Sequence, residues 1–151
     1  MSMDTACSSA LVAIDACSLS LQSHHYRGGL ASSTSLKLVP HPTLLSGAAG
    51  MLSLDGRCKT FDARANGYVR SESYGGIMLV ERADTGSLLS SSSVRQDGRS
   101  ASLTAPNGSA QRTLLQTTWA RAGIAGRDMQ SIETHGTGTA LGDPTEAGSL
   151  A

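Results

Sequence analysis

The feature that most constrains this chain is a cysteine placed directly in front of a helix-forming run. Apolar residues behind Cys7 recur on one helix face at Leu11, Ile14 and Leu21, which predicts a helix from about Ser8 to Gln22. The first N–H groups of a helix lack intrahelical partners and form the positive end of its dipole, so they favour a thiolate. This position suits a nucleophile, although cysteines are more often packed structural residues, and both interpretations stand at this stage.

Composition limits the classes of protein to consider. The chain has 151 residues, of which 39% are hydrophobic and only 3% aromatic, so it is expected to form one globular domain with a core of small aliphatic side chains. Its formal net charge is zero, and it has no basic run, so the electrostatic footprint of a nucleic-acid-binding protein is missing. No apolar run reaches the roughly 18 residues that predict a membrane span, and no signal-peptide pattern is present.

The three cysteines leave one unpaired in any disulfide scheme, and none has the spacing of a zinc site. Reduced thiols, no metal and a cytoplasmic location are therefore expected. Targeting to an organelle is left open, because the sequence starts abruptly at Met1, as a truncated N-terminus would. Cys17, in the helix behind Cys7, is expected to be a packing residue, and Cys58 lies in a polar loop without an evident partner.

A second long motif lies near the other end of the chain. Glycines alternate with threonines behind His135, and an acidic segment follows, in the string Glu133-Thr134-His135-Gly136-Thr137-Gly138-Thr139-Ala140-Leu141-Gly142-Asp143-Pro144-Thr145-Glu146. Together with Asp4-Thr5-Ala6-Cys7-Ser8-Ser9, this string resembles the active-site motifs of β-ketoacyl synthases, in particular the ketosynthase domains of modular-type polyketide synthases. Residues 54–62, 96–99 and 103–108 also resemble this family. The resemblance covers nearly the whole chain, but only the middle of the family's domain.

The resemblance implies an α/β fold of the thiolase-like class, with α/β/α/β/α layers made by two similar halves of βαβαβαββ architecture, here incomplete. Residues 1–82 would end the N-terminal half, residues 83–95 would form a shortened connection, and residues 96–151 would begin the C-terminal half.

The implied activity is that of an acyltransferase that elongates a polyketide chain by decarboxylative Claisen condensation. In this scheme Cys7 carries the acyl group, and His135 hydrogen-bonds the malonyl thioester oxygen and assists decarboxylation. Thr137 and Thr139 contact the phosphopantetheine arm of an acyl carrier protein. No cofactor is bound directly. The implied partners are the carrier protein, acyl and malonyl thioesters, and a second copy of the full domain.

The chain also departs from the family pattern. Ser32-Ser33 replaces a glycine pair, serines flank Glu72, and the second catalytic histidine of the family is absent, so the isolated chain is expected to be inactive. Two alternatives therefore remain. One is a fatty-acid β-ketoacyl synthase with the same chemistry, and the other is an inactive ketosynthase remnant or interaction protein.

Local patterns predict several further elements. We expect strands at Leu30–Val39, Gly76–Glu81 (buried) and Met129–Glu133, a helix at Ala110–Ala122, a surface turn at His24-His25, a flexible linker through Ser90–Ser93, and a helix N-cap at Asp143.

Overall fold

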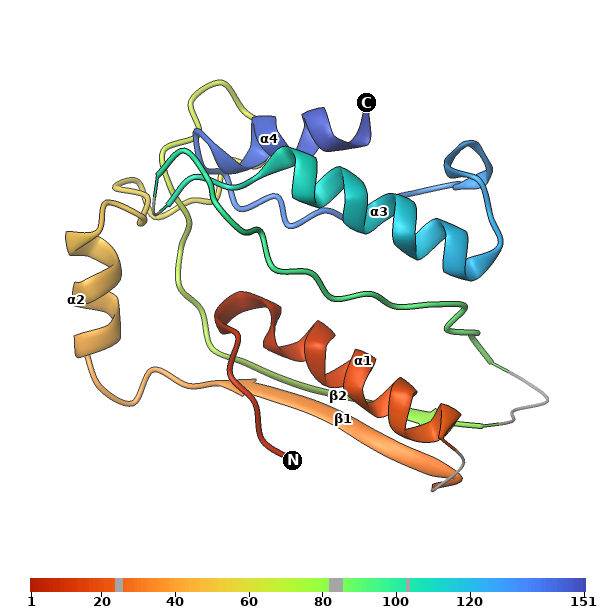
Figure 1. Cartoon of the computed structure of the whole chain (residues 1–151). Coiled ribbons are helices and arrows are strands. Elements are labelled where there is room, and N and C mark those ends of the chain that lie inside the picture. The colour runs from red at the N-terminus through yellow and green to blue at the C-terminus, as the bar shows by residue number, and fades with distance from the viewer. Residues whose placement is uncertain (24–25, 82–85, 103) are drawn as a thin grey trace.

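The computed structural model describes residues 1–23, 26–81, 86–102 and 104–151. The predicted turn at residues 24–25 and residues 82–85 of the predicted connection lie outside this range. Four α-helices, two β-strands and two short 3-10 helices form in the described part (Figure 1). The helices are α1 (Ser9–Gln22), α2 (His41–Ala48), α3 (Gly108–Ala122) and α4 (Gly142–Leu150), the strands are β1 (Gly28–Ser35) and β2 (Ser73–Val80), and the 3-10 helices are η1 (Ala6–Ser8) and η2 (Gly126–Asp128).

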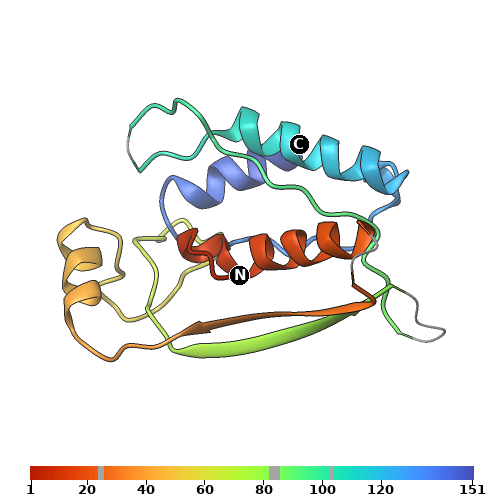
Figure 2. The same ribbon diagram turned by 60° about the horizontal axis from the view of Figure 1, so that its bottom comes forward.

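The two strands form an antiparallel sheet whose register runs from Gly28 opposite Val80 to Ser35 opposite Ser73. Helix α1 lies across one face of this sheet (Figure 2). A Cβ atom at Gly29 would lie only 2.5 Å from the Cys17 sulfur, so this glycine allows α1 to approach the strand closely. Cys17 therefore packs against the sheet, as the sequence predicts.

The opposite face of the sheet is open. Leu30 and Met78 form a cross-strand pair on that face and are 64% and 63% exposed, respectively. Side chains alternate between the two faces of a strand, so Val80 shares this face and is also exposed. The predicted strand near Gly76–Glu81 is confirmed, but its predicted burial is wrong, because no element of the described chain covers this face.

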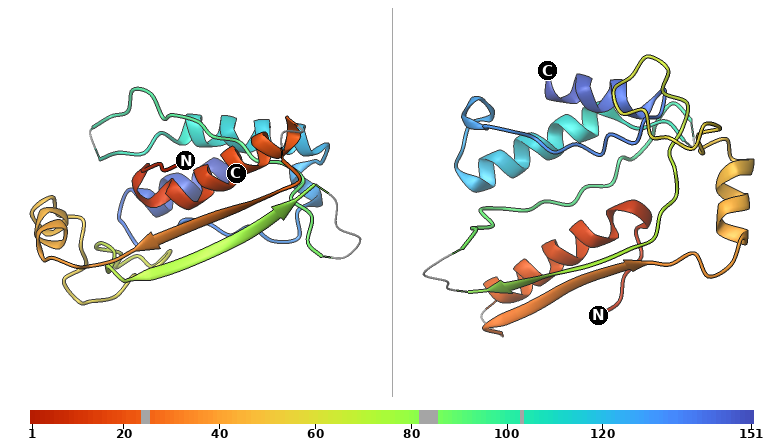
Figure 3. Two further views of the ribbon diagram at one scale, coloured as in Figure 1. Left: turned by 90° about the horizontal axis from the view of Figure 1, so that it is seen from below. Right: turned by 180° about the vertical axis from the view of Figure 1, so that it is seen from behind.

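The serine-rich stretch is ordered by hydrogen bonds, so its prediction as a flexible linker is wrong. It runs as an extended segment between α1 and α3 (Figure 1; Figure 3, right). The Ser92 hydroxyl donates to the Asp15 carboxylate of α1 at 2.7 Å, and the Ser91 hydroxyl donates to the Thr118 carbonyl of α3 at 2.8 Å. Arg121 of α3 donates to the Ser92 carbonyl at 3.0 Å. These side-chain bonds connect the two helices through the segment.

Helix α3 ends at Ala122, as the sequence predicts, but begins at Gly108, two residues before the predicted start. The Asn107 side chain accepts a hydrogen bond from the Ala110 N–H at the N-cap, and Gly123 ends the helix in the left-handed conformation with φ of 69°. Arg112 then joins α3 to α4 by donating to the Gly148 carbonyl at 2.6 Å.

Two predictions near the C-terminal motif are wrong. Residues 129–133 form no strand, because no segment of the described chain pairs with them through backbone hydrogen bonds. Helix α4 begins at Gly142 with Leu141 as its N-cap, so Asp143 is already inside the first turn. Its carboxylate accepts hydrogen bonds from two other loops, described below, and does not cap its own helix.

The core is small for a chain of this size. Among the described residues, only Leu21, Ala31 and Ala110 are buried apolar residues. The accessible surface is 11287 Å², whereas a compact monomer of the same mass exposes about 7200 Å². No helix in the described ranges is long and apolar enough to cross a membrane. The fold therefore presents far more surface than its own packing covers.

Candidate active site

The first part of the site is the tight turn that carries Cys7. Cys7 lies in η1, directly before α1, and its side chain is exposed. Ala6 has a φ of 56°, which costs a residue with a Cβ about 1–2 kcal/mol. Side chains hold this turn: an Asp4 carboxylate oxygen accepts the Ala6 N–H at 2.9 Å, while the Ser9 hydroxyl accepts the Thr5 N–H at 2.9 Å. The thiol is thus fixed at the start of the helix.

The second part is the loop of residues 134–139, which we call the histidine loop. Gly136 and Gly138 both have positive φ, 51° and 75°, which glycine adopts without strain. A Cβ at Gly138 would lie 2.5 Å from the Lys59 backbone nitrogen, so this glycine also allows two backbone segments to approach closely. Glycine at positions 136 and 138 is therefore required by the backbone conformation and close packing of this loop.

Two carboxylates on the first turns of α4 hold the histidine loop in place. One Glu146 oxygen accepts the His135 N–H at 2.6 Å, and the other accepts the Gly136 N–H at 2.9 Å. Asp143 is only 3% exposed and accepts the Gly138 N–H at 3.1 Å. Residues three apart in a helix share a face, so both acids point at the same loop.

A third segment, residues 58–67, lies against the histidine loop and is joined to it. Asp143 accepts the Phe61 N–H at 2.7 Å with its second oxygen, and the Gly67 N–H donates to the Gly138 carbonyl at 3.0 Å. The Thr60 hydroxyl donates to the Gly136 carbonyl. Asp143 thus bridges two loops that are far apart in the sequence.

Ion pairs stabilise this third segment locally. Hydrogen bonds from the Arg64 guanidinium hold the pKa of the Asp62 carboxyl well below its usual range. A hydrogen bond from the Lys59 ammonium likewise lowers the pKa of Asp55. Both acids are ionised at neutral pH, and because these ion pairs lie at the surface, their contribution to stability is small.

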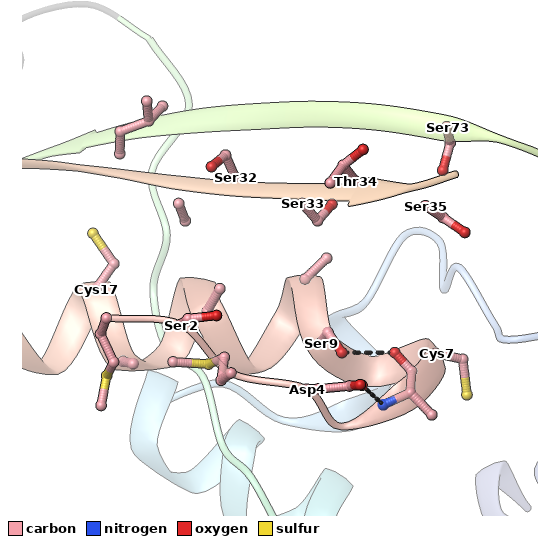
Figure 4. Close-up of a pocket in the computed structure, with 18 of the residues that line it drawn as sticks. Ser2, Asp4, Cys7, Ser9, Cys17, Ser32, Ser33, Thr34, Ser35 and Ser73 are labelled. Atoms are coloured by element: carbon pink, nitrogen blue, oxygen red, sulfur yellow. Dashed lines mark hydrogen bonds between the residues drawn. The ribbon is translucent and has the colours of Figure 1, made fainter. Parts of the chain in front are cut away.

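An open cavity of about 1550 Å³ lies between α1, the sheet and the N-terminal arm. Cys7, His135 and Thr137 all contribute to its lining, so residues of both motifs border the same open cavity. Figure 4 shows the turn with Cys7 at one end of α1 and the strands across from it. Thr139 is not part of this lining; its hydroxyl accepts the Gly142 N–H at 3.1 Å and helps to start α4.

Sequence reasoning missed the supporting role of Asp143 and the contact with residues 58–67. The two acids three residues apart after a glycine loop were a usable signal, because a loop of glycines needs acceptors for its N–H groups. The serines that flank Glu72 adopt ordinary backbone conformations. Neither has positive φ, and the Glu72 carboxylate accepts the Lys37 N–H at 2.6 Å.

The arrangement is chemically simple. It offers an exposed thiol at a helix start, as a nucleophile, and an imidazole on the wall of the same cavity, as a hydrogen-bond donor or proton carrier. Among the described residues, no cluster of three or more histidine, cysteine or acidic side chains could hold a metal ion. Covalent chemistry at sulfur assisted by a histidine is the chemistry that these residues support.

Comparison with protein families gives two adjacent matches. Residues 1–85 match the family model "Beta-ketoacyl synthase, N-terminal domain", and residues 87–151 match "Beta-ketoacyl synthase, C-terminal domain".

Among curated proteins, one component of the phenolphthiocerol/phthiocerol polyketide synthase of Mycobacterium tuberculosis is 42% identical over 156 residues, which covers 98% of this chain and 7% of that protein. A highly reducing polyketide synthase of Aspergillus terreus is 39% identical over 100% of this chain and 6% of its own length. Erythronolide synthase EryA3 of Saccharopolyspora erythraea is 37% identical over 99% of this chain and 5% of that protein. The chain thus spans a small part of each curated relative.

Solved structures give the same result for the fold. An oxazolomycin ketosynthase domain from Streptomyces albus superposes with a TM-score of 0.94 at 33% identity, covering 99% of this chain and 27% of that one. The ketosynthase from module 6 of the bacillaene synthase of Bacillus subtilis superposes with a TM-score of 0.92 at 36% identity, covering 98% and 28%. The expected thiolase-like α/β fold is confirmed as part of a larger domain. This chain belongs to the β-ketoacyl synthase family, and its relatives are the ketosynthase domains of polyketide synthases.

Proposed function

We propose that this chain is the central part of a ketosynthase domain that extends polyketide chains by decarboxylative condensation. Residues 1–82 end the N-terminal half, residues 83–95 connect the halves, and residues 96–151 begin the C-terminal half. The observation that carries the proposal is the meeting of Cys7 and His135, from two distant motifs, on one cavity. The large exposed surface supports a position inside a larger domain.

Cys7 is the acyl carrier in this proposal. Its sulfur attacks the carbonyl carbon of an acyl thioester, the bond to the donor sulfur breaks, and the proton of the Cys7 thiol ends on the released thiol. The helix start behind Cys7 favours the thiolate, and the exposure of the side chain leaves room for a thioester.

His135 acts in the second half of the reaction. When a malonyl thioester loses carbon dioxide, negative charge develops on its thioester oxygen, and a positioned donor stabilises that charge. Glu146 fixes the backbone on both sides of the Cα atom of His135 by accepting two N–H groups, so the imidazole has a defined starting point. The complete domain supplies the second histidine.

Thr137 and Thr139 are proposed to serve the phosphopantetheine arm of an acyl carrier protein. Thr137 lies on the cavity wall and is the direct contact, whereas Thr139 acts through the shape of the loop, given its bond to Gly142. The proposed partners are the carrier protein, acyl and malonyl thioesters and a second ketosynthase copy. A cytoplasmic location is part of this proposal, since three cysteines without zinc-site spacing favour reduced thiols.

Two variants in the complete ketosynthase test these roles separately. Cys7→Ala should abolish acylation by a radiolabelled acyl thioester, because the nucleophilic sulfur is lost. His135→Ala should leave acylation of Cys7 intact and strongly reduce the release of carbon dioxide from a malonyl thioester. Undiminished decarboxylation in the His135→Ala variant would overturn its role, and undiminished acylation in the Cys7→Ala variant would overturn the whole proposal.

A further inference from the structure

Arg70 is a half-buried cation on the wall of the cavity that Cys7 and His135 line. It is the only lysine or arginine among the described residues of that lining, and Asp4 is the only acid. Asp4 belongs to the turn before α1, where its carboxylate accepts the Ala6 N–H. The described ion pairs involve other side chains, so no carboxylate of the described chain neutralises Arg70.

One N–H group of this guanidinium has no acceptor. The Nε atom of Arg70 is buried and is the only buried side-chain nitrogen or oxygen in the described ranges without a hydrogen-bond partner. The guanidinium makes one long bond, from an Nη atom to the Ser46 hydroxyl at 3.4 Å. Ser46 also lines the cavity, so this bond holds the charged end at the cavity wall. An unpaired buried N–H is unfavourable, and a guanidinium is best satisfied by two parallel bonds to one carboxylate.

The main chain places Arg70 between the two motifs of the candidate site. Three residues before it, the Gly67 N–H donates to the Gly138 carbonyl of the histidine loop at 3.0 Å. Three residues after it, Ser73 begins β2 at the end of the sheet where the turn with Cys7 lies (Figure 4). Three residues of chain span at most about 10 Å, so Arg70 lies on a short path from one motif to the other.

We propose that Arg70 binds the carboxylate of the malonyl-type extender through its Nε and an Nη atom, and thereby selects and positions the extender. This inference rests on the proposed function and adds a binding residue for its second substrate. Among the reacting groups of the proposed condensation, only the extender carries a carboxylate. His135 bonds the thioester oxygen of the extender, so a contact at the carboxylate holds the malonyl group at both ends.

The contact acts before the chemical step. When the extender loses carbon dioxide, the bond between the α-carbon and the carboxyl carbon breaks, its electron pair stays on the enolate, and carbon dioxide leaves uncharged. Arg70 therefore loses its anion in the transition state, while negative charge grows on the oxygen that His135 bonds. An interaction that is lost in the transition state lowers KM and does not raise kcat.

The test measures the release of carbon dioxide from malonyl-N-acetylcysteamine by the complete ketosynthase and its Arg70→Gln variant. This probe has the carboxylate but no phosphate, and the enolate left behind takes a proton from water. A hydrogen bond to a charged group contributes about ten- to hundredfold, so KM for the probe should rise at least about tenfold. The value of kcat should stay the same or rise. Arg70→Lys keeps the charge but loses the planar fork, so its KM should lie between the two.

Two controls separate extender binding from a structural role. Arg57→Gln is the matched variant, because Arg57 is exposed and is not part of the cavity lining, and its KM should equal that of the wild type. Acylation of Cys7 by hexanoyl-N-acetylcysteamine is the second readout. That probe carries no charge, so its rate constant in Arg70→Gln should change far less than KM for the malonyl probe. If Arg70→Gln does not fold, Arg70→Lys alone is used, and it should still raise KM.

The outcomes separate this inference from the proposed function. An unchanged KM in the Arg70 variants would overturn the carboxylate contact, and so would a parallel loss of kcat and of acylation, which would give Arg70 a structural role. An effect with malonyl carrier protein but none with malonyl-N-acetylcysteamine would overturn it as well, because the anion would then be the phosphate of the arm. Each of these results leaves Cys7 as the acyl carrier. No acylation of Cys7 in the folded wild-type protein would overturn the proposed function and this inference together.

Discussion

Replacing Asp143 by alanine is expected to weaken the attachment of the histidine loop to the segment of residues 58–67, which the Gly67–Gly138 and Thr60–Gly136 hydrogen bonds still join. The carboxylate is 3% exposed and accepts two backbone N–H groups, from Phe61 at 2.7 Å and Gly138 at 3.1 Å. A hydrogen bond to a charged acceptor contributes about 1.5–3 kcal/mol to stability. Loss of both bonds should therefore lower the free energy of unfolding of the complete ketosynthase by about 3–5 kcal/mol, allowing for incomplete additivity.

A graded series makes this prediction sharper. Asp143→Asn keeps the shape and one acceptor oxygen but turns an amide NH₂ toward the other N–H, so about half of the loss is expected. Asp128→Ala is the control, since its carboxylate is 60% exposed and accepts one local N–H at 3.2 Å. Changes at such surface positions usually remain within about 0.5 kcal/mol.

The assay is urea unfolding of each variant combined with amide hydrogen exchange. Exchange should accelerate in the peptides that contain Phe61 and Gly138, and only there, because the bridge between those two segments is lost. The reasoning would be refuted if Asp143→Ala cost no more stability than Asp128→Ala. Unchanged exchange at both segments would refute it equally.

Three further predictions concern the thiols, the ion pairs and the chain itself. Limiting iodoacetamide should label Cys7 first, since Cys17 is packed against β1 and the Cys58 sulfur accepts a backbone hydrogen bond. Preferential labelling of Cys17 or Cys58 in a peptide map would contradict this prediction. The Asp62 carboxyl should titrate well below the usual range in an NMR pH series. Its pairing with Arg64 should stabilise the fold at pH values above the unfolded-state pKa, and this stabilisation should be lost as the pH falls through the lower folded-state pKa. A normal titration curve for Asp62, unchanged in Arg64→Gln, would show that the pair does not form. The 151-residue chain alone should give no ketoacyl product and no cooperative thermal transition, because only three apolar residues are buried among those that the structure describes; a cooperative melt together with product would contradict both statements.

Local sequence patterns predicted those elements whose ends are determined locally. Helix α3 is an example, because Asn107 and Gly123 provide its caps through their own side chain and backbone conformation. Helix α1 is another, because its apolar spacing starts directly after the turn with Cys7. Such features need no information about the rest of the fold.

Other features depend on partners that a local pattern cannot show. The segment with Ser91 and Ser92 is polar enough to suggest a linker. In the fold, however, its hydroxyls donate hydrogen bonds to the Thr118 carbonyl and the Asp15 carboxylate, which are far away in the sequence. The local sequence predicts Asp143 as an N-cap, but in the fold its carboxylate accepts the backbone N–H groups of Phe61 and Gly138 from two other loops. Residues 129–133 have the composition of a strand, yet a strand requires a neighbour.

The candidate site was reached in two steps of different kinds. The position of Cys7 at a helix start suggested a nucleophile from physical chemistry alone. That His135 belongs to the same site came only from the resemblance, since nothing in either local pattern indicates a distance between them. The structure then placed both on one cavity and left Thr139 out of it.

The most direct test of the account is to find where an acyl group is attached. The complete ketosynthase is incubated with an acyl thioester, digested, and analysed by tandem mass spectrometry. We predict an acyl mass increase on the peptide that contains Cys7, and its disappearance in Cys7→Ala. An adduct on Cys17 or Cys58 in place of Cys7, or no adduct in a folded protein, would contradict the central claim that this turn carries the nucleophile of a condensing enzyme.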